Sequence, residues 1–283
     1  ATAHTILGFD SVMPVFSIIQ ESSALGCKMQ WEGKDNWPTV RMSEPIWDSV
    51  DDIYIPNDLT SHPDTQCVLD AIKLLREELG PDVAIIGKTM GPWSLAYHCF
   101  GVEKFLLLSL DDPEATKAIL EKLKKVTIDF GIAQVEAGVD ALTLPDHATG
   151  DLVSGEYYQR YLRDLHIEFA ERIPCPLILH ICGRTVDRMG FISETGMAAF
   201  HYDSKNAPEE SMQTVEGRIA LVGNINNPET LFSKGPEDVK AEVFANLDAG
   251  EQMIGPECAV PLQTSIANLR AIPEAVREWH AAH

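Results

Sequence analysis

The sequence of 283 residues has few basic side chains, because 22 Lys and Arg stand against 43 Asp and Glu, a formal net charge of −21 at pH 7. This deficit disfavours nucleic acids and anionic membrane surfaces as partners, since both are bound mainly through Lys and Arg. The sequence also lacks an apolar run of about 18 residues, the length of a membrane-spanning helix, and its start carries no secretion signal pattern. We therefore expect a globular protein of the cytoplasm that binds neither nucleic acid nor membrane.

Two common cofactor and scaffold patterns are absent as well. No Gly-x-Gly-x-x-Gly motif follows a predicted strand, and there is no Walker A loop, so the sequence offers no standard nucleotide site. Six cysteines are too sparse for a disulfide scaffold. Each cysteine is therefore expected to be a core residue, a metal ligand or a nucleophile, and its position has to decide which.

Short apolar runs typical of strands alternate with longer stretches of helical period along the chain, which is the pattern of β-α-β units. The seven runs cover residues 11–16, 83–88, 141–144, 177–182, 198–203, 219–225 and 252–258, and a last helix is expected over 264–280. We predict an α/β fold, a TIM (β/α)8 barrel formed as one domain over residues 1–283. Since a barrel of this kind has eight strands, we further expect that its N-terminal segment and first strand are missing from this chain.

Residues 177–183 carry the most distinctive local pattern, Leu-Ile-Leu-His-Ile-Cys-Gly. Side chains two residues apart on a strand share a face. His180 and Cys182 should therefore point the same way at the carboxyl end of a strand, where barrel enzymes build their active sites.

Cys258, at the end of the seventh run, supplies a third soft donor at another strand end. One imidazole and two thiolates suit Zn²⁺, and three protein ligands leave a fourth position open for a substrate. From the residues alone, two other interpretations stay open: a buried histidine beside inert thiols, and redox chemistry of the cysteines.

Acidic residues near these strand ends are candidates for the surroundings of the metal. Asp203 could be a displaceable fourth ligand or an acceptor that orients His180, although capping the following helix is an equally good explanation. Glu257 competes for the same role, but as the neighbour of Cys258 it should point to the opposite face of a regular strand. We rank Asp203 first.

Asp146 follows the predicted strand at residues 141–144, and Asn224 lies at the end of the one at residues 219–225. Their positions make them candidates for the substrate pocket, since strand ends of a barrel converge. For Asp146 the alternative is a solvated loop.

Successive segments of the chain resemble one known superfamily. They are Gly91-Pro92-Trp93-Ser94-Leu95, Asp112-Pro113-Glu114, Asp146, His180-Ile181-Cys182-Gly183, Glu194-Thr195-Gly196, Gly223-Asn224-Ile225 and residues 255–261. Together they cover essentially the whole chain and resemble the uroporphyrinogen decarboxylase superfamily. Within it, the His-x-Cys pair followed by a distant cysteine is similar to the zinc-dependent methylcobamide:coenzyme M methyltransferases of methanogenic archaea.

This resemblance implies a TIM barrel that moves a methyl group from a methylated corrinoid protein to the thiol of coenzyme M, a step of methanogenesis. It implies zinc at His180, Cys182 and Cys258, with a corrinoid protein and coenzyme M as partners. In the related cobalamin-independent methionine synthases a carboxylate at a position similar to that of Asp203 is also a zinc ligand. Two alternatives remain: a metal-free decarboxylase of porphyrinogens, and a subunit that binds a corrinoid protein without turnover.

Overall fold

The structure, a computed structural model, describes residues 1–14, 17–34 and 36–283. The chain divides into two compact units. The first, here the C-terminal unit, comprises Ala1–Val12, Ala148–Ala170 and Pro176–His283, and the second, the N-terminal unit, comprises Met13–His147 and Glu171–Cys175. The expectation of a single domain over residues 1–283 stays a prediction.

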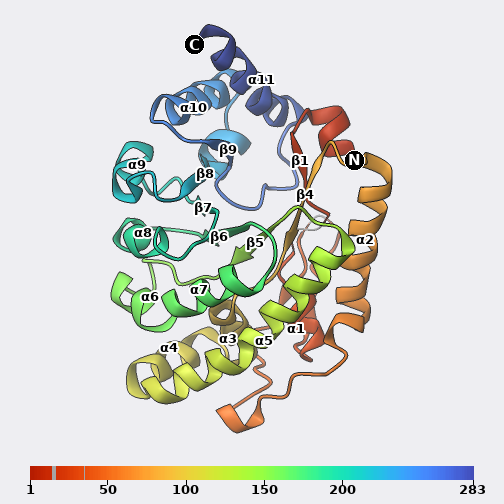
Figure 1. Cartoon of the computed structure of the whole chain (residues 1–283), viewed down its shortest axis with the longest axis vertical. Coiled ribbons are helices and arrows are strands. Elements are labelled where there is room, and N and C mark those ends of the chain that lie inside the picture. The colour runs from red at the N-terminus through yellow and green to blue at the C-terminus, as the bar shows by residue number, and fades with distance from the viewer. Residues whose placement is uncertain (15–16, 35) are drawn as a thin grey trace. The chain divides into compact units, whose positions relative to one another are not determined.

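The C-terminal unit contains a run of four parallel strands. They are β6 (Leu177–Ile181), β7 (Ala199–Tyr202), β8 (Ala220–Ile225) and β9 (Met253–Pro256). Each pairs in parallel with the next, with His180 opposite His201 and Ile225 opposite Pro256. The helices that connect them lie on one side of the strands in Figure 1: α8 (Val186–Ile192), α9 (Pro208–Val215) and α10 (Pro236–Asp248). The carboxyl ends of all four strands therefore meet at one edge.

The remaining elements of this unit are η1 (Ala3–Leu7), β1 (Ser11–Val12), α6 (Gly155–Tyr161), most of α7 (Arg163–Arg172), η4 (Asn227–Phe232) and α11 (Ile266–Ala282). Helices α10 and α11 pack on the end of β8 through buried aliphatic side chains, among them Val239, Val243, Ala271 and Ile272 around Ile225. This apolar layer supports the strand-end loops from one side.

The N-terminal unit is built around two parallel strands, β4 (Ala84–Lys88) and β5 (Ala141–Pro145). Its helices and short elements are α1 (Gln20–Ala24), β2 (Met29–Gln30), β3 (Thr39–Val40), η2 (Val50–Asp52), η3 (Leu59–Ser61), α2 (Pro63–Leu79), α3 (Pro92–Phe100), α4 (Val102–Asp111) and α5 (Pro113–Ala137). Asp112 caps the start of α5, because its side chain accepts a hydrogen bond from the amide of Ala115.

Each of the seven predicted runs contains a strand, and the predicted alternation with helices is confirmed. Of the first run, residues 15–16 lie outside the described residues. The strands β6, β7 and β9 end one or two residues earlier than predicted, so that Cys182, Asp203 and Cys258 lie just beyond them. Gly183 has a φ of 79°, a left-handed conformation that cannot continue a strand, and Pro256 has no amide hydrogen to extend the ladder.

The antiparallel pair β2–β3 has no counterpart among the predicted elements. Strands of two residues carry too little alternation to be recognised in a sequence. Among the helices that the structure describes, none combines the length and the apolar character needed to cross a membrane.

Candidate metal centre

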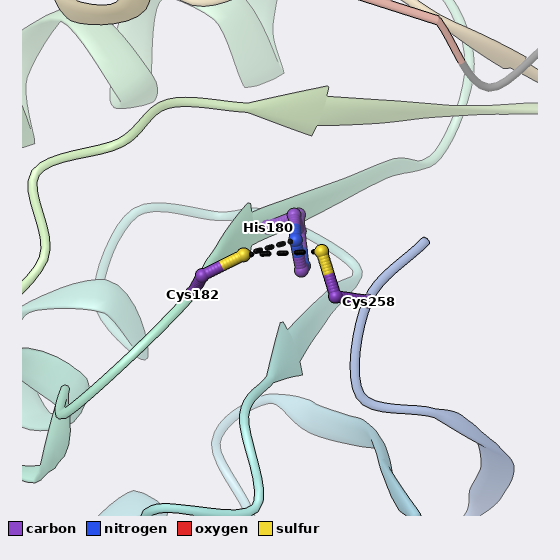
Figure 2. Close-up of side chains that lie close together, drawn as sticks. All are labelled: His180, Cys182 and Cys258. Carbon is purple, nitrogen blue, oxygen red and sulfur yellow. Dashed lines mark hydrogen bonds between the residues drawn. The ribbon is translucent and has the colours of Figure 1, made fainter. Parts of the chain in front are cut away.

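His180 lies near the carboxyl end of β6, and its side chain is fully buried. Its Nδ1 atom is 3.2 Å from the carbonyl oxygen of His201 on the neighbouring strand. Because a carbonyl oxygen only accepts hydrogen bonds, Nδ1 carries the proton and Nε2 presents a lone pair. Nε2 lies 3.1 Å from Sγ of Cys182 (Figure 2). The contact with His201 therefore holds the imidazole in the tautomer and orientation that a metal ligand needs.

Two thiols meet this imidazole from loops that are far apart in the sequence. Sγ of Cys182 is 3.2 Å from Sγ of Cys258, and both side chains are half-buried (Figure 2). The donor atoms of His180, Cys182 and Cys258 all lie within 4.8 Å of one another. In the part of the chain that the structure describes, this is the only group of three or more potential metal-ligating residues. The structure thus brings together the three residues predicted from the sequence.

The geometry and chemistry of this group fit zinc. Zinc binds thiolate sulfur at about 2.3 Å and imidazole nitrogen at about 2.0 Å, so around one tetrahedral ion two sulfurs lie about 3.8 Å apart and a nitrogen and a sulfur about 3.5 Å apart. The nitrogen–sulfur distance of 3.1 Å and the sulfur–sulfur distance of 3.2 Å are slightly shorter, so a small outward movement of the side chains would admit the ion. One imidazole and two thiolates form the borderline-soft set that zinc prefers, with a fourth position left for an exogenous ligand.

The two thiols also affect each other's ionisation. The hydrogen bond from Cys182 is the main cause that lowers the pKa of Cys258 to about 3, and the same contact raises the pKa of Cys182. The pair therefore releases one proton easily and shares the other. A divalent cation would displace this second proton, since only thiolates bind metals.

Asp203 was predicted as the last residue of a strand and lies directly after β7, where its carboxylate accepts hydrogen bonds from backbone amides. Oδ2 is 2.8 Å from the amide nitrogen of Gly183, and Oδ1 is 2.9 Å from that of Lys205. The alternative that Asp203 caps the following helix is wrong, because the N-cap of α9 is Ala207. Asp203 thus contacts the loop that carries Cys182, and its role as fourth ligand or as acceptor near the metal stays a prediction.

Glu257 precedes Cys258, and its side chain is buried. Its oxygens accept hydrogen bonds from the amide of Ser204 at 3.0 Å and from that of Asn227 at 2.8 Å. Burial is the largest cause that raises the pKa of this carboxyl group. Glu257 therefore joins two other strand-end loops to the loop of Cys258.

Two residues of this centre were not predicted from the sequence. His201 stacks beside His180 with ring centroids 4.4 Å apart, and its Nε2 donates to the carbonyl oxygen of Pro256 at 2.7 Å. Its position next to a predicted strand end was a usable signal. Asn206 is buried and makes four hydrogen bonds to neighbouring backbone groups. An asparagine in a loop carries no sequence signal for such a role.

The two candidates for the substrate pocket lie in different units. Asn224 is buried in the C-terminal unit, where its amide donates to the carbonyl oxygen of Asn206 at 2.9 Å. Asp146, in the N-terminal unit, is fully buried and accepts from the amide of Ser94 in the first turn of α3 at 2.9 Å. The solvated-loop alternative for Asp146 is therefore wrong. A substrate contact by either residue stays a prediction.

Comparison with characterised proteins gives relatives of two kinds. The chain is 29% identical over 280 residues to the methylcobamide:CoM methyltransferase MtaA of Methanosarcina barkeri, covering 98% of this chain and 82% of that protein. It is 26% identical over 262 residues to the uroporphyrinogen decarboxylase of Klebsiella pneumoniae, covering 86% of this chain and 71% of that enzyme.

A solved structure with the same fold is that of a methyltransferase from Methanosarcina mazei, with a TM-score of 0.94 and 27% identity, covering 99% of this chain and 83% of that one. This similarity confirms the predicted α/β class, a TIM-barrel-like fold of the uroporphyrinogen decarboxylase type. A sequence profile described as "Uroporphyrinogen decarboxylase (URO-D)" matches residues 1–279. The chain therefore belongs to the uroporphyrinogen decarboxylase family.

Proposed function

We propose that this protein is a zinc-dependent methyltransferase that moves a methyl group from a methylated corrinoid protein to the thiol of coenzyme M, a step of methanogenesis. The observation that carries the proposal is the convergence of His180, Cys182 and Cys258 on one point at the strand ends. Relatives named methylcobamide:CoM methyltransferases support the choice of methyl donor and acceptor.

The chain's own residues supply the platform for this reaction. Cys182 and Cys258 present two thiolate donors, and His180 presents the Nε2 lone pair that its contact with His201 leaves available. When bound, zinc would lower the pKa of the substrate thiol and hold it as a thiolate at neutral pH. Two protein thiolates donate negative charge to the site, which favours a nucleophilic substrate sulfur over an electrophilic role.

The methyl transfer needs no oxidant, reductant or other co-reactant. An electron pair of the substrate thiolate forms the sulfur–carbon bond, while the pair of the cobalt–carbon bond stays with the corrinoid. The proton of the substrate thiol leaves to solvent when the thiol binds. Since the donor is carried by another protein, we propose a corrinoid protein as the partner, and the choice among methanol, methylamines and other methyl sources belongs to earlier steps.

The test uses the purified chain with free methylcobalamin and coenzyme M. We expect about one zinc per chain by elemental analysis, methylated coenzyme M by mass spectrometry, and loss of both in Cys258→Ala. The exposed Cys67 offers a matched control, and Cys67→Ser should keep both properties.

Two outcomes would replace the proposal by one of its alternatives. Decarboxylation of a porphyrinogen that survives removal of all metal would indicate the metal-free decarboxylase, and a relative from Klebsiella pneumoniae is named uroporphyrinogen decarboxylase. Tight binding of a corrinoid protein without any methylated thiol would indicate a binding subunit.

A further inference from the structure

The loop of residues 203–206, which follows β7, touches the loops of both cysteine ligands. On one side, Asn206 donates to the carbonyl oxygen of Gly183 at 2.9 Å and accepts from the amide of Thr185 at 2.7 Å. On the other side, the amide of Ser204 donates to the carboxylate of Glu257 at 3.0 Å. Gly183 follows Cys182 and Glu257 precedes Cys258. The loop therefore lies between the two segments whose separation sets the sulfur–sulfur distance.

Both side chains that make these contacts are buried, and every polar side-chain atom of the two forms a hydrogen bond with a backbone group. Asn206 is 2% exposed and Glu257 is 6% exposed. The amide group of Asn206 also donates to the carbonyl oxygen of Asp203 at 2.9 Å, which ties the loop to itself. The second carboxylate oxygen of Glu257 accepts from the amide of Asn227 at 2.8 Å. Each side chain is thus fixed by backbone groups of two different segments, at a position next to the segments that carry the cysteines.

We infer that Asn206 and Glu257 are positioning residues, which act through the loop of residues 203–206 to hold Cys182 and Cys258 at the separation that one zinc ion requires. The inference rests on the proposed zinc site but not on the reaction carried out there. Groups that orient metal ligands from outside the coordination sphere typically change metal affinity by about 10–100-fold when they are altered. We expect an effect of this size from either residue.

Two nearly isosteric substitutions test the inference. Asn206→Asp keeps an acceptor for the amide of Thr185 but replaces both donated hydrogen bonds by oxygen–oxygen repulsion. Glu257→Gln keeps one acceptor oxygen and sets an NH₂ group against a backbone amide. Each should lower zinc affinity about 10–100-fold, measured by competition with a chromogenic chelator. The visible spectrum of the cobalt(II)-substituted protein should also change, because it reports the coordination geometry.

The same unit offers a matched control away from the metal centre. Asn268 is 3% exposed and donates to the carbonyl oxygens of Leu231 and Lys234 at 2.8 and 2.9 Å. Asn268→Asp should lower the melting temperature as the test variants do, yet leave zinc affinity and the cobalt spectrum unchanged.

A milder pair of variants covers the case in which a test variant does not fold. Asn206→Ser removes the two donors but keeps an oxygen, and Glu257→Asp keeps the charge but is too short to reach both amides. Each should give an intermediate loss of zinc affinity. A double substitution should cost less than the product of the two single effects, because both act on the one sulfur–sulfur distance.

Unchanged zinc affinity in the folded test variants would overturn the inference and leave the proposed zinc site standing. An equal loss in the control would also overturn it, since the effect would then come from general destabilisation. A wild-type chain that takes up no zinc would overturn both the inference and the proposed function.

Discussion

The protein contains two pairs of cysteines in close contact, one in each unit, and they differ in what surrounds them. In the N-terminal unit Sγ of Cys27 is 3.7 Å from Sγ of Cys99, and in the C-terminal unit the distance between Cys182 and Cys258 is 3.2 Å. The first pair is buried and the second is half-buried. Burial raises the pKa of Cys99, whereas the contact with Cys182 lowers that of Cys258 to about 3.

A histidine lies beside each pair, but only one of them faces the thiols. His98 precedes Cys99 on helix α3, where consecutive side chains point in different directions, and its Nδ1 is 2.6 Å from the hydroxyl oxygen of Ser22. His180 and Cys182 are separated by one residue at the end of a strand and point the same way. Two thiols in contact do not by themselves suggest a metal site, whereas a third donor that faces them makes the second pair a candidate.

The strongest way to break this comparison is to remove single ligands. Altering a residue outside the ligand set typically lowers metal affinity by about 10–100-fold. We expect a larger loss of zinc affinity from each of Cys182→Ala, Cys258→Ala and His180→Ala. Cys27→Ala and Cys99→Ala should keep about one zinc per chain. Elemental analysis at a fixed free zinc concentration measures the zinc bound by each variant. An equal loss of zinc in the variants of the two cysteine pairs would contradict the prediction.

Thiol reactivity should separate the pairs as clearly. With zinc bound, an aromatic disulfide reagent should label neither pair, because coordination blocks one and burial blocks the other. A chelator should expose the thiols of Cys182 and Cys258 only, and Cys27 and Cys99 should react only after unfolding.

Labelling is best measured on a background of Cys67→Ser and Cys175→Ser, since these thiols are exposed or half-buried. Rapid labelling of Cys99 in the folded protein would contradict its assignment to the core.

The histidine beside the buried pair predicts how stability depends on pH. Burial lowers the pKa of His98 from its usual value of 6.5 to about 3. As the pH falls from about 6.5 towards 3, the unfolded chain binds a proton that the folded chain does not, so the free energy of unfolding decreases. The slope from this one group is about 1.4 kcal/mol per pH unit.

In His98→Gln this contribution should disappear, and denaturant unfolding at several pH values measures it. The variant should be less stable than the wild type near pH 7, since the contact with Ser22 is changed. An identical pH slope in both proteins would show that His98 is not held neutral by burial.

The smallest expected difference concerns stability without metal. Cys99→Ala removes a fully buried sulfur from the core and should lower the free energy of unfolding by about 0.5–3 kcal/mol. Cys182→Ala in the metal-free protein should cost less, because its side chain is only half-buried. Urea unfolding of the two metal-free variants at one pH gives the comparison directly. A larger loss in Cys182→Ala would mean that the loops of the metal centre are themselves part of the core.

Much of the strand framework could be predicted, because an apolar run with turn residues at its ends can be recognised from the local sequence alone. The run at residues 177–182 contains β6 and the run at 219–225 contains β8. The end of β6 was missed by one residue, since the left-handed conformation of Gly183 is a response to its surroundings: a Cβ atom there would lie 2.2 Å from the hydroxyl oxygen of Thr149. The two-residue strands β2 and β3 were missed because they carry no usable pattern.

By itself the sequence determined the identity of the three metal-ligand candidates, since the period of a strand places His180 and Cys182 on one face and the parallel order brings the end of the seventh run to the same edge. Only the tertiary structure decided which groups surround them. The carbonyl of His201, the amide of Asn206 and the carboxylate of Glu257 form hydrogen bonds between strands and loops that are distant in sequence. Such bonds depend on directions and distances of about 3 Å, and residue types and spacing do not specify these until the chain has folded.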